Sequence, residues 1–114
     1  MRGVVGFSDF QKINDYLYIG NQVSAMQLSR LKQEGMTHIL KVNGIDTLVP
    51  LSLTKLQTKI VALEDNEHYE ITDADLHECF NFIKGEGKKT LVVCTAGISR
   101  SSTICIAYLM WHEG

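Results

Sequence analysis

The sequence predicts an α/β fold of three layers, in which a mostly parallel central sheet is flanked by helices. Short apolar, β-branched runs alternate with segments of helical periodicity, which is typical of strand–helix–strand units. The 114 residues, 45% of them apolar and 21% charged, suffice for a single core. The predicted strands are residues 16–20, 38–42, 59–63 and 90–93, and the predicted helices are residues 24–33, 72–84 and 100–112.

Local signals mark the ends of the first two helices. Leu28 and Leu31 are expected on the inward face of the first, and Gly35 is a typical stop. Thr72 is expected to cap the second helix, with Asp75 as the acid of a capping box. Four apolar residues are expected on its inward face and two glycines at its end, namely Leu76, Cys79, Phe80, Ile83, Gly85 and Gly87.

The third helix is apolar on nearly all sides, as a buried helix is. Only Glu113 and Gly114 follow it. A large apolar face is costly to leave in water. We therefore expect this helical region to be covered by self-association or by another chain.

Composition excludes several classes of function. The net charge of −2, without a basic run, argues against a nucleic acid partner. No stretch approaches the length of a membrane span, so no membrane partner is expected. Cys79, Cys94 and Cys105 are odd in number and unpatterned, which indicates a reducing compartment such as the cytoplasm or the nucleus. Their spacing does not fit a metal site, and no metal or other cofactor is expected.

Residues 91–101 have the layout of a phosphate cradle with a nucleophile at its base. An apolar run ends at Cys94, small or apolar residues follow, and Arg100 stands where the next helix begins. Free N–H groups at a helix N-terminus and in a loop of small residues bind anions. Arg100 adds a planar fork that can hold two oxygens, and the positive field favours the thiolate of Cys94. The alternative is a buried structural cysteine that ends a core strand.

A covalent phosphocysteine mechanism follows from the cradle. Cys94 would attack phosphorus while Arg100 and the backbone N–H groups of the loop hold the three equatorial oxygens. An acid must protonate the leaving group. The hydroxyl of Ser101 can donate to the departing thiolate; the alternative is that Ser101 is a plain residue of the first helical turn. The loop that would bind the phosphate consists of Thr95, Ala96, Gly97, Ile98, Ser99 and Arg100.

Several ordered motifs resemble the catalytic domain of the dual-specificity protein phosphatases, within the cysteine-based protein tyrosine phosphatase superfamily. Cys94-Thr-Ala-Gly-Ile-Ser-Arg-Ser101 resembles the family signature Cys-x-Ala-Gly-x-Ser-Arg-Ser. The flanking segments 15–20, 36–40, 62–66 and 102–110 resemble the family's first strand, second strand, general-acid segment and the helix after the loop. The resemblance covers about residues 13–113. It implies that residues 1–114 form a single catalytic domain, short at its C-terminus because further helices normally follow.

The resemblance implies hydrolysis of phosphorylated protein substrates, with phosphotyrosine and phosphoserine or phosphothreonine accepted in a shallow pocket. It places the general acid at Asp65, which would then act as the base toward water. Glu64 and Glu67 are the neighbouring alternatives, and Asp65 could instead be a solvated loop acid. The loop carries no lysine, which disfavours phosphoinositide substrates.

One position departs from the family pattern. The residue before the nucleophile is normally His, which helps to order the loop and to keep the cysteine ionised, and it is Val93 in this chain. A weaker catalyst is therefore expected. The departure also motivates a second interpretation, a pseudophosphatase that binds phosphoprotein or a partner without turnover.

The remaining cysteines and histidines have structural interpretations. Cys79 and Cys105 fall on inward helical faces and are expected in the core. His38 is expected to be structural within a strand, and His77 is expected on a helix surface. No motif ties any histidine to Cys94.

Overall fold

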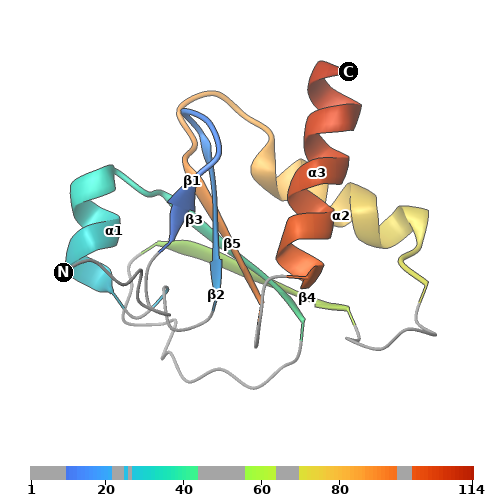
Figure 1. Cartoon of the computed structure of the whole chain (residues 1–114), viewed down its shortest axis with the longest axis horizontal. Helices are drawn as coiled ribbons and strands as arrows, with labels where there is room; N and C mark the ends of the chain where they lie inside the picture. Colours follow the sequence, from blue (N-terminus) through green and yellow to red (C-terminus); the bar gives the residue numbers. More distant parts are fainter. Residues whose placement is uncertain (1–9, 22–24, 26, 44–55, 64–69, 95–98) are drawn as a thin grey trace, which may run out of the picture.

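A mixed sheet forms the centre of the molecule (Figure 1). The computed structural model describes residues 10–21, 25, 27–43, 56–63, 70–94 and 99–114. Within these residues the sheet has five strands, in the spatial order β1 (Gln11–Lys12), β2 (Leu17–Asn21), β5 (Thr90–Cys94), β3 (His38–Asn43) and β4 (Gln57–Leu63). The pairs β2–β5, β5–β3 and β3–β4 are parallel, and β1 pairs with β2 antiparallel. The prediction of an α/β fold with a mostly parallel sheet is confirmed.

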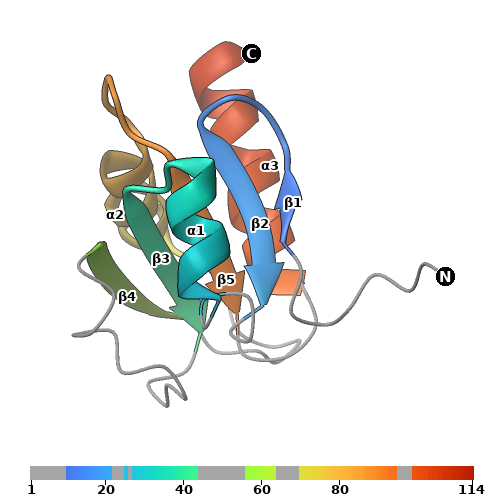
Figure 2. The same cartoon turned by 90° about the vertical axis from the view of Figure 1, so that its left-hand side faces the viewer.

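Helices cover both faces of this sheet and give the three layers (Figure 2). Helix α1 (Leu28–Glu34) lies on one face, and α2 (Asp73–Ile83) and α3 (Ser99–Glu113) lie on the other. An apolar cluster fills each space between layers. We call these the α1-side cluster, which contains Leu31 of α1, and the α2–α3 cluster, which contains Ile83 and Ile104.

Strand β5 takes part in both clusters, because it lies in the middle of the sheet. Leu91 and Val93 belong to the α1-side cluster, whereas Val92 and Cys94 belong to the α2–α3 cluster. Every residue of the strand is buried. A continuous apolar run without polar alternation is what a strand covered on both faces requires.

The predicted helix ends are confirmed at two positions. Gly35 ends α1 in the left-handed region, with φ of 78°, and its N–H bonds back to the carbonyls of Leu31 and Lys32. Because a side chain is strained at such a φ, glycine suits the position. At the start of α2, the Thr72 hydroxyl accepts from the Asp75 N–H at 3.1 Å, and the Asp75 carboxylate accepts from the Thr72 N–H at 3.3 Å.

Helix α1 is shorter than predicted, and Leu28 does not share the inward face with Leu31. Leu31 is 1% exposed, whereas Leu28 is 42% exposed. Residues three apart are separated by about 60° around a helix axis. When the seven-residue helix is rotated about its axis so that Leu31 faces the sheet, Leu28 lies at the border between the buried and the exposed side.

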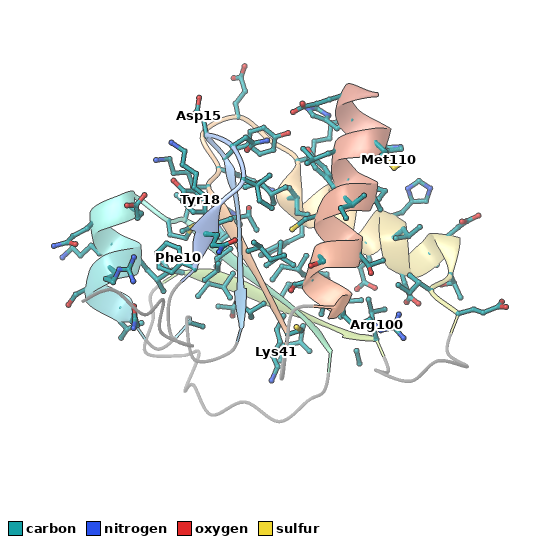
Figure 3. All side chains as sticks on the ribbon, viewed as in Figure 1. Phe10, Asp15, Tyr18, Lys41, Arg100 and Met110 are labelled. Atoms are coloured by element: carbon teal, nitrogen blue, oxygen red, sulfur yellow. The ribbon has the colours of Figure 1, made fainter. Side chains whose placement is uncertain are left out.

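Within this chain, helix α3 is buried on one side only, which leaves the apolar face for which cover by self-association or by another chain is expected. Ile104 and Tyr108 are buried, but Ile106, Met110 and Trp111 are 59%, 71% and 45% exposed. Met110 extends from the side of α3 that is turned away from the sheet (Figure 3). Only one side of the helix faces the sheet and α2, so the apolar residues beyond that side remain at the surface. Among the described residues, no helix combines the length and the apolar character of a membrane span.

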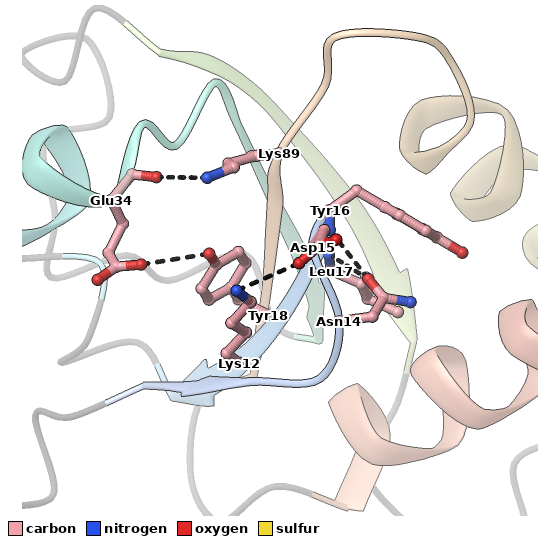
Figure 4. A network of polar contacts seen from close by, with 8 residues as sticks. All are labelled: Lys12, Asn14, Asp15, Tyr16, Leu17, Tyr18, Glu34 and Lys89. Atoms are coloured by element: carbon pink, nitrogen blue, oxygen red, sulfur yellow. Dashed lines mark hydrogen bonds and ion pairs between the residues drawn. The ribbon is translucent and has the colours of Figure 1, made fainter.

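Strand β1 was not predicted, because two polar, exposed residues have no periodicity to detect. Local polar contacts hold its turn into β2 (Figure 4). The Asn14 side-chain oxygen accepts from the N–H groups of Tyr16 and Leu17, both at 2.9 Å. Lys12 pairs with Asp15 at 3.3 Å. These contacts order the edge of the sheet at the amino ends of the parallel strands.

A second group of contacts ties the end of α1 to the sheet (Figure 4). The Tyr18 hydroxyl donates to the Glu34 carboxylate at 3.2 Å, and Lys89 Nζ donates to the Glu34 carbonyl at 2.9 Å. The last turn of α1 is thereby held against β2 and the start of β5. These contacts lie at the amino ends of the parallel strands. The other side of the sheet, where the carboxyl ends of the parallel strands lie in a row, is called the carboxyl edge below.

The two leucines of α1 provide a matched test of this packing. Leu31→Ala is expected to lower the free energy of unfolding by about 2–5 kcal/mol, because it leaves a cavity in the α1-side cluster. Leu28→Ala is expected to change it by less than about 0.5–1 kcal/mol, because the side chain is largely exposed. Urea denaturation of both variants measures the difference, and equal losses would contradict the assigned roll of the helix.

Candidate active site

The predicted nucleophile lies at the carboxyl edge of the sheet, at the end of the central strand. Cys94 is the last residue of β5, and α3 begins at Ser99. Open α/β sheets bind ligands at this edge. Cys94 is held by its pairing with β2, where Asn21 is its register partner, and the pairing of β5 with β3 extends to the preceding residue, Val93.

Cys94 meets the start of α3 through Ser101. The two side-chain atoms, Cys94 Sγ and Ser101 Oγ, are 3.5 Å apart, and either can donate to the other. Both residues are buried, at 1% and 0% exposed. The first turn of α3 has backbone N–H groups without intrahelical partners and the positive end of the helix dipole. The structure therefore brings the predicted nucleophile, Cys94, into contact with Ser101, the hydroxyl that is predicted to donate to its sulfur. This position is suited to an anion.

Arg100 is the second residue of α3 and is half-buried. It lies at the carboxyl edge, at the end of α3 that faces this edge (Figure 3). A guanidinium group in this position can contribute a full positive charge and paired N–H donors.

Several predicted site residues fall outside the described residues. These are Asp65, with its alternatives Glu64 and Glu67, and the loop residues Thr95, Ala96, Gly97 and Ile98. Ser99 is described as the first residue of α3. Strand β4, which precedes Asp65 in the chain, ends at Leu63 on the same carboxyl edge. The roles of these residues remain predictions.

Val93 occupies the position at which the family pattern differs. Its side chain is 1% exposed and belongs to the α1-side cluster, on the face of the sheet opposite to Cys94. An apolar residue suits these neighbours, which include Ala25, Leu31 and Ile39. The position contributes packing on the α1 side and no charge.

Lys41 is a residue that sequence analysis did not single out. It lies on β3, is 2% exposed, and is the register partner of Val93. Its side chain extends at the carboxyl edge (Figure 3). A sequence signal for it exists, because a lysine within the apolar run His-Ile-Leu-Lys-Val of residues 38–42 would be unusual in a buried strand.

The other two cysteines are core residues, as predicted. Cys79 and Cys105 are 0% and 1% exposed. Removal from water disfavours the charged thiolate, and it raises the pKa of each thiol to about 12. Nearby carboxylates of Glu78 and Asp75 add to the shift of the pKa at Cys79. Both thiols are therefore protonated at neutral pH.

The described histidines have structural surroundings. His38 is buried against the Phe82 ring, and its Nδ1 lies 2.6 Å from the Thr37 hydroxyl. Burial lowers the pKa of His38, and the charge of Lys88 lowers it further. His38 pairs with the first residue of β5, about 13 Å along the strand from Cys94. His77 is exposed on α2, as predicted. No group of acidic, cysteine or histidine side chains in the described residues could hold a metal ion.

The order of the strands and the helices on both faces of the sheet are those of the cysteine-based phosphatases. The family of dual specificity phosphatase catalytic domains matches residues 17–114, and the chain belongs to this family. Its central strand, its mixed sheet and its flanking helices are those expected from the resemblance.

Two curated relatives show the extent of the similarity. Human dual specificity protein phosphatase 2 is 39% identical over 103 residues, which cover 87% of this chain and 32% of the relative. The protein-tyrosine-phosphatase MKP1 of Arabidopsis thaliana is 33% identical over 106 residues, which cover 90% of this chain and 13% of the relative. The chain thus spans a third or less of the length of these two relatives.

Solved structures give the same result. The crystal structure of DUSP15 superimposes with a TM-score of 0.76 at 32% identity, over 89% of this chain and 64% of that one. A human tyrosine phosphatase-like serine/threonine/tyrosine-interacting protein superimposes with a TM-score of 0.80 at 31% identity, over 92% and 74% of the two chains.

The buried thiols make stability fall in alkaline solution. In the unfolded chain the thiols of Cys79 and Cys105 ionise near their ordinary pKa of about 8.5, whereas the folded protein retains their protons up to about pH 12. Between these values the unfolded state binds fewer protons. The free energy of unfolding therefore falls as pH rises, by up to about 1.4 kcal/mol per pH unit for each thiol.

Urea titrations at pH 8 and pH 10.5 measure this dependence. Cys105→Ala removes one of the two ionising thiols, so the loss of stability between the two pH values should be smaller than in the wild type. The cavity created by the substitution lowers stability at both pH values and leaves the comparison intact. An unchanged pH dependence would show that Cys105 ionises normally in the folded protein.

Proposed function

We propose that this chain is the catalytic part of a protein phosphatase that hydrolyses phosphotyrosine and phosphoserine or phosphothreonine through a phosphocysteine intermediate. The observation that supports it most is the contact of Cys94 with Ser101, between the end of the central strand and the first turn of α3. Family membership supports the reaction class.

In the first step the Cys94 thiolate attacks phosphorus in line with the leaving oxygen. The S–P bond forms and the P–O bond to the substrate side chain breaks. Arg100 and the N–H groups at the start of α3 hold the equatorial oxygens, where the charge of the transition state is spread. Asp65 is proposed as the acid that protonates the departing oxygen.

In the second step water attacks the phosphocysteine. Asp65, now ionised, takes a proton from the water, the S–P bond breaks, and inorganic phosphate leaves. The electron pair returns to Cys94 Sγ, which becomes a thiolate again. Ser101 is placed to stabilise this thiolate, because its hydroxyl lies 3.5 Å from the sulfur and can donate to it.

The substrate class follows from the residues that would line the cradle. Thr95, Ala96, Ile98 and Ser99 carry no positive charge, which favours phosphoprotein over the more anionic phosphoinositides. No disulfide joins Cys79, Cys94 or Cys105, which agrees with a reducing compartment. A role in cytoplasmic or nuclear signalling is the setting that we propose for such an activity.

A pseudophosphatase that binds without turnover is the second candidate. Val93 supplies no charge beside the nucleophile. One structural relative is described as a phosphatase-like, interacting protein. Retention of Cys94, Arg100, Asp65 and Ser101 in the sequence favours the enzyme.

Hydrolysis of a small aryl phosphate by the wild type and by Cys94→Ser tests the proposal. Loss of the nucleophile is expected to reduce kcat/KM by at least about 10³-fold. Cys79→Ala removes a core thiol of α2 that has no part in the proposed reaction, and it should retain activity at temperatures where it is folded.

Binding of an oxyanion separates the two candidate functions. Orthovanadate should raise the melting temperature in either case, because both need the cradle. Turnover that depends on Cys94 establishes the enzyme. Stabilisation by vanadate without any turnover would replace it with the binding protein, and neither effect would contradict both.

Ser101→Ala isolates the second step. Without the hydroxyl, the departing thiolate loses one hydrogen bond to a charged atom, so kcat should fall by about 10–100-fold. The first step is less affected, so kcat/KM should change little and phenolate should appear as a burst. Ser102→Ala is the matched control, one residue further along α3. A steady-state rate without a burst would contradict the proposed role.

A further inference from the structure

We propose that Lys41 is a positioning residue of this site: its buried ammonium group stabilises the negative charge held at Cys94 and Arg100 from the opposite face of the sheet. The inference rests on the proposed phosphate site. It adds a second cation that the family motif does not contain.

The backbone register places Lys41 next to the nucleophile. Lys41 on β3 pairs with Val93 on β5, so it lies one residue before Cys94 on the adjacent strand. Strands are about 4.8 Å apart and residues rise about 3.3 Å along a strand, which gives a Cα separation of about 6 Å from Cys94.

Lys41 and Cys94 extend from opposite faces of the sheet, and this limits how Lys41 can act on the site. Ile39 and Val93, the neighbours of Lys41 along and across the strands, belong to the α1-side cluster, whereas Cys94 belongs to the α2–α3 cluster. Because side chains alternate along a strand, Lys41 leaves β3 on the α1 side. It therefore does not contact the attacked phosphorus from the side of Cys94, and its influence is electrostatic.

The burial of Lys41 is unusual. Among the described residues it is the one lysine or arginine whose side chain is buried, at 2% exposed. A buried ammonium group is costly unless negative charge or hydrogen-bond acceptors compensate. Its side chain extends at the carboxyl edge, at which Arg100 also lies (Figure 3). Lys41 and Arg100 thus bring two basic side chains to the same edge of the sheet.

The sheet is irregular next to Lys41. Lys41 pairs with Ile60 of β4, but Asn43 pairs with Leu63, so the register shifts by one residue between them. Such bulges twist a strand and redirect its side chains, and they are frequent beside active sites. The regular ladder of β3 thus ends where its lysine approaches the carboxyl edge.

The charge of the bound state can be shared by several positive groups. A phosphate monoester dianion and the Cys94 thiolate together carry three negative charges. Arg100 supplies one positive charge and the N-terminus of α3 supplies about half of another. A further full charge on the neighbouring strand, in a medium of low polarity, favours both the thiolate and the bound dianion.

Neutralisation of Lys41 tests the inference. Lys41→Met has a similar length without the charge, Lys41→Arg retains the charge, and Lys32→Met makes the same change of net charge at an exposed position of α1. We expect Lys41→Met to lower kcat/KM and to weaken inorganic tungstate binding by about 10–100-fold each. Lys41→Arg should recover most of both, and Lys32→Met should behave as the wild type.

A measurement on the wild-type chain covers the case in which Lys41→Met does not fold. With ¹³C-labelled lysine, the signal of the Lys41 methylene next to nitrogen should shift when tungstate binds, and the signal of Lys32 should not. No shift at Lys41, or a folded Lys41→Met variant with unchanged tungstate affinity and kcat/KM, would overturn the inference.

The experiments on Lys41 can succeed or fail separately from the proposed enzyme activity. If the wild type binds tungstate without turnover, the enzyme proposal fails while the affinity and the lysine signal still decide the role of Lys41. If turnover depends on Cys94 but not on Lys41, the enzyme proposal stands and this inference fails.

Discussion

The burial of β5 on both faces is the constraint on which the rest of the structure depends. Both apolar clusters include residues of this strand, so the α1 layer and the α2–α3 layer are joined through it. Its last residue, Cys94, is consequently positioned by core packing and by its pairing with β2. The sulfur then lies where the apolar core ends and α3 begins, beside Ser101.

The apolar core and the carboxyl edge place different requirements on a thiol. Removal from water opposes ionisation of a thiol, as the raised pKa of about 12 at Cys79 and at Cys105 demonstrates. A thiolate at the edge of the same core requires positive charge close by. The carboxyl edge can supply it through the start of α3 and through Arg100, and Lys41 would extend the same field into the α1 side.

Features encoded by a few neighbouring residues could be predicted from the sequence. The left-handed Gly35 and the capping box of Thr72 and Asp75 depend on contacts within one turn. The exposure of Leu28 and of the apolar side of α3 depends instead on which side of each helix faces the sheet. That orientation is set by packing between layers, and a local sequence pattern does not encode it. Lys41 is detectable as a lysine within an apolar run, but its place beside Val93 follows only from the sheet order.

The candidate site shows the same division between local and long-range contacts. Cys94 ends β5 and Ser101 lies seven residues later, in the first turn of α3, so their spacing in the sequence predicts their contact. The proposed acid, Asp65, follows β4, which is separated from β5 by β3. This strand order brings together residues that are far apart in the sequence, so no spacing assigns an acid to the nucleophile. The assignment to Asp65 therefore comes from the family resemblance.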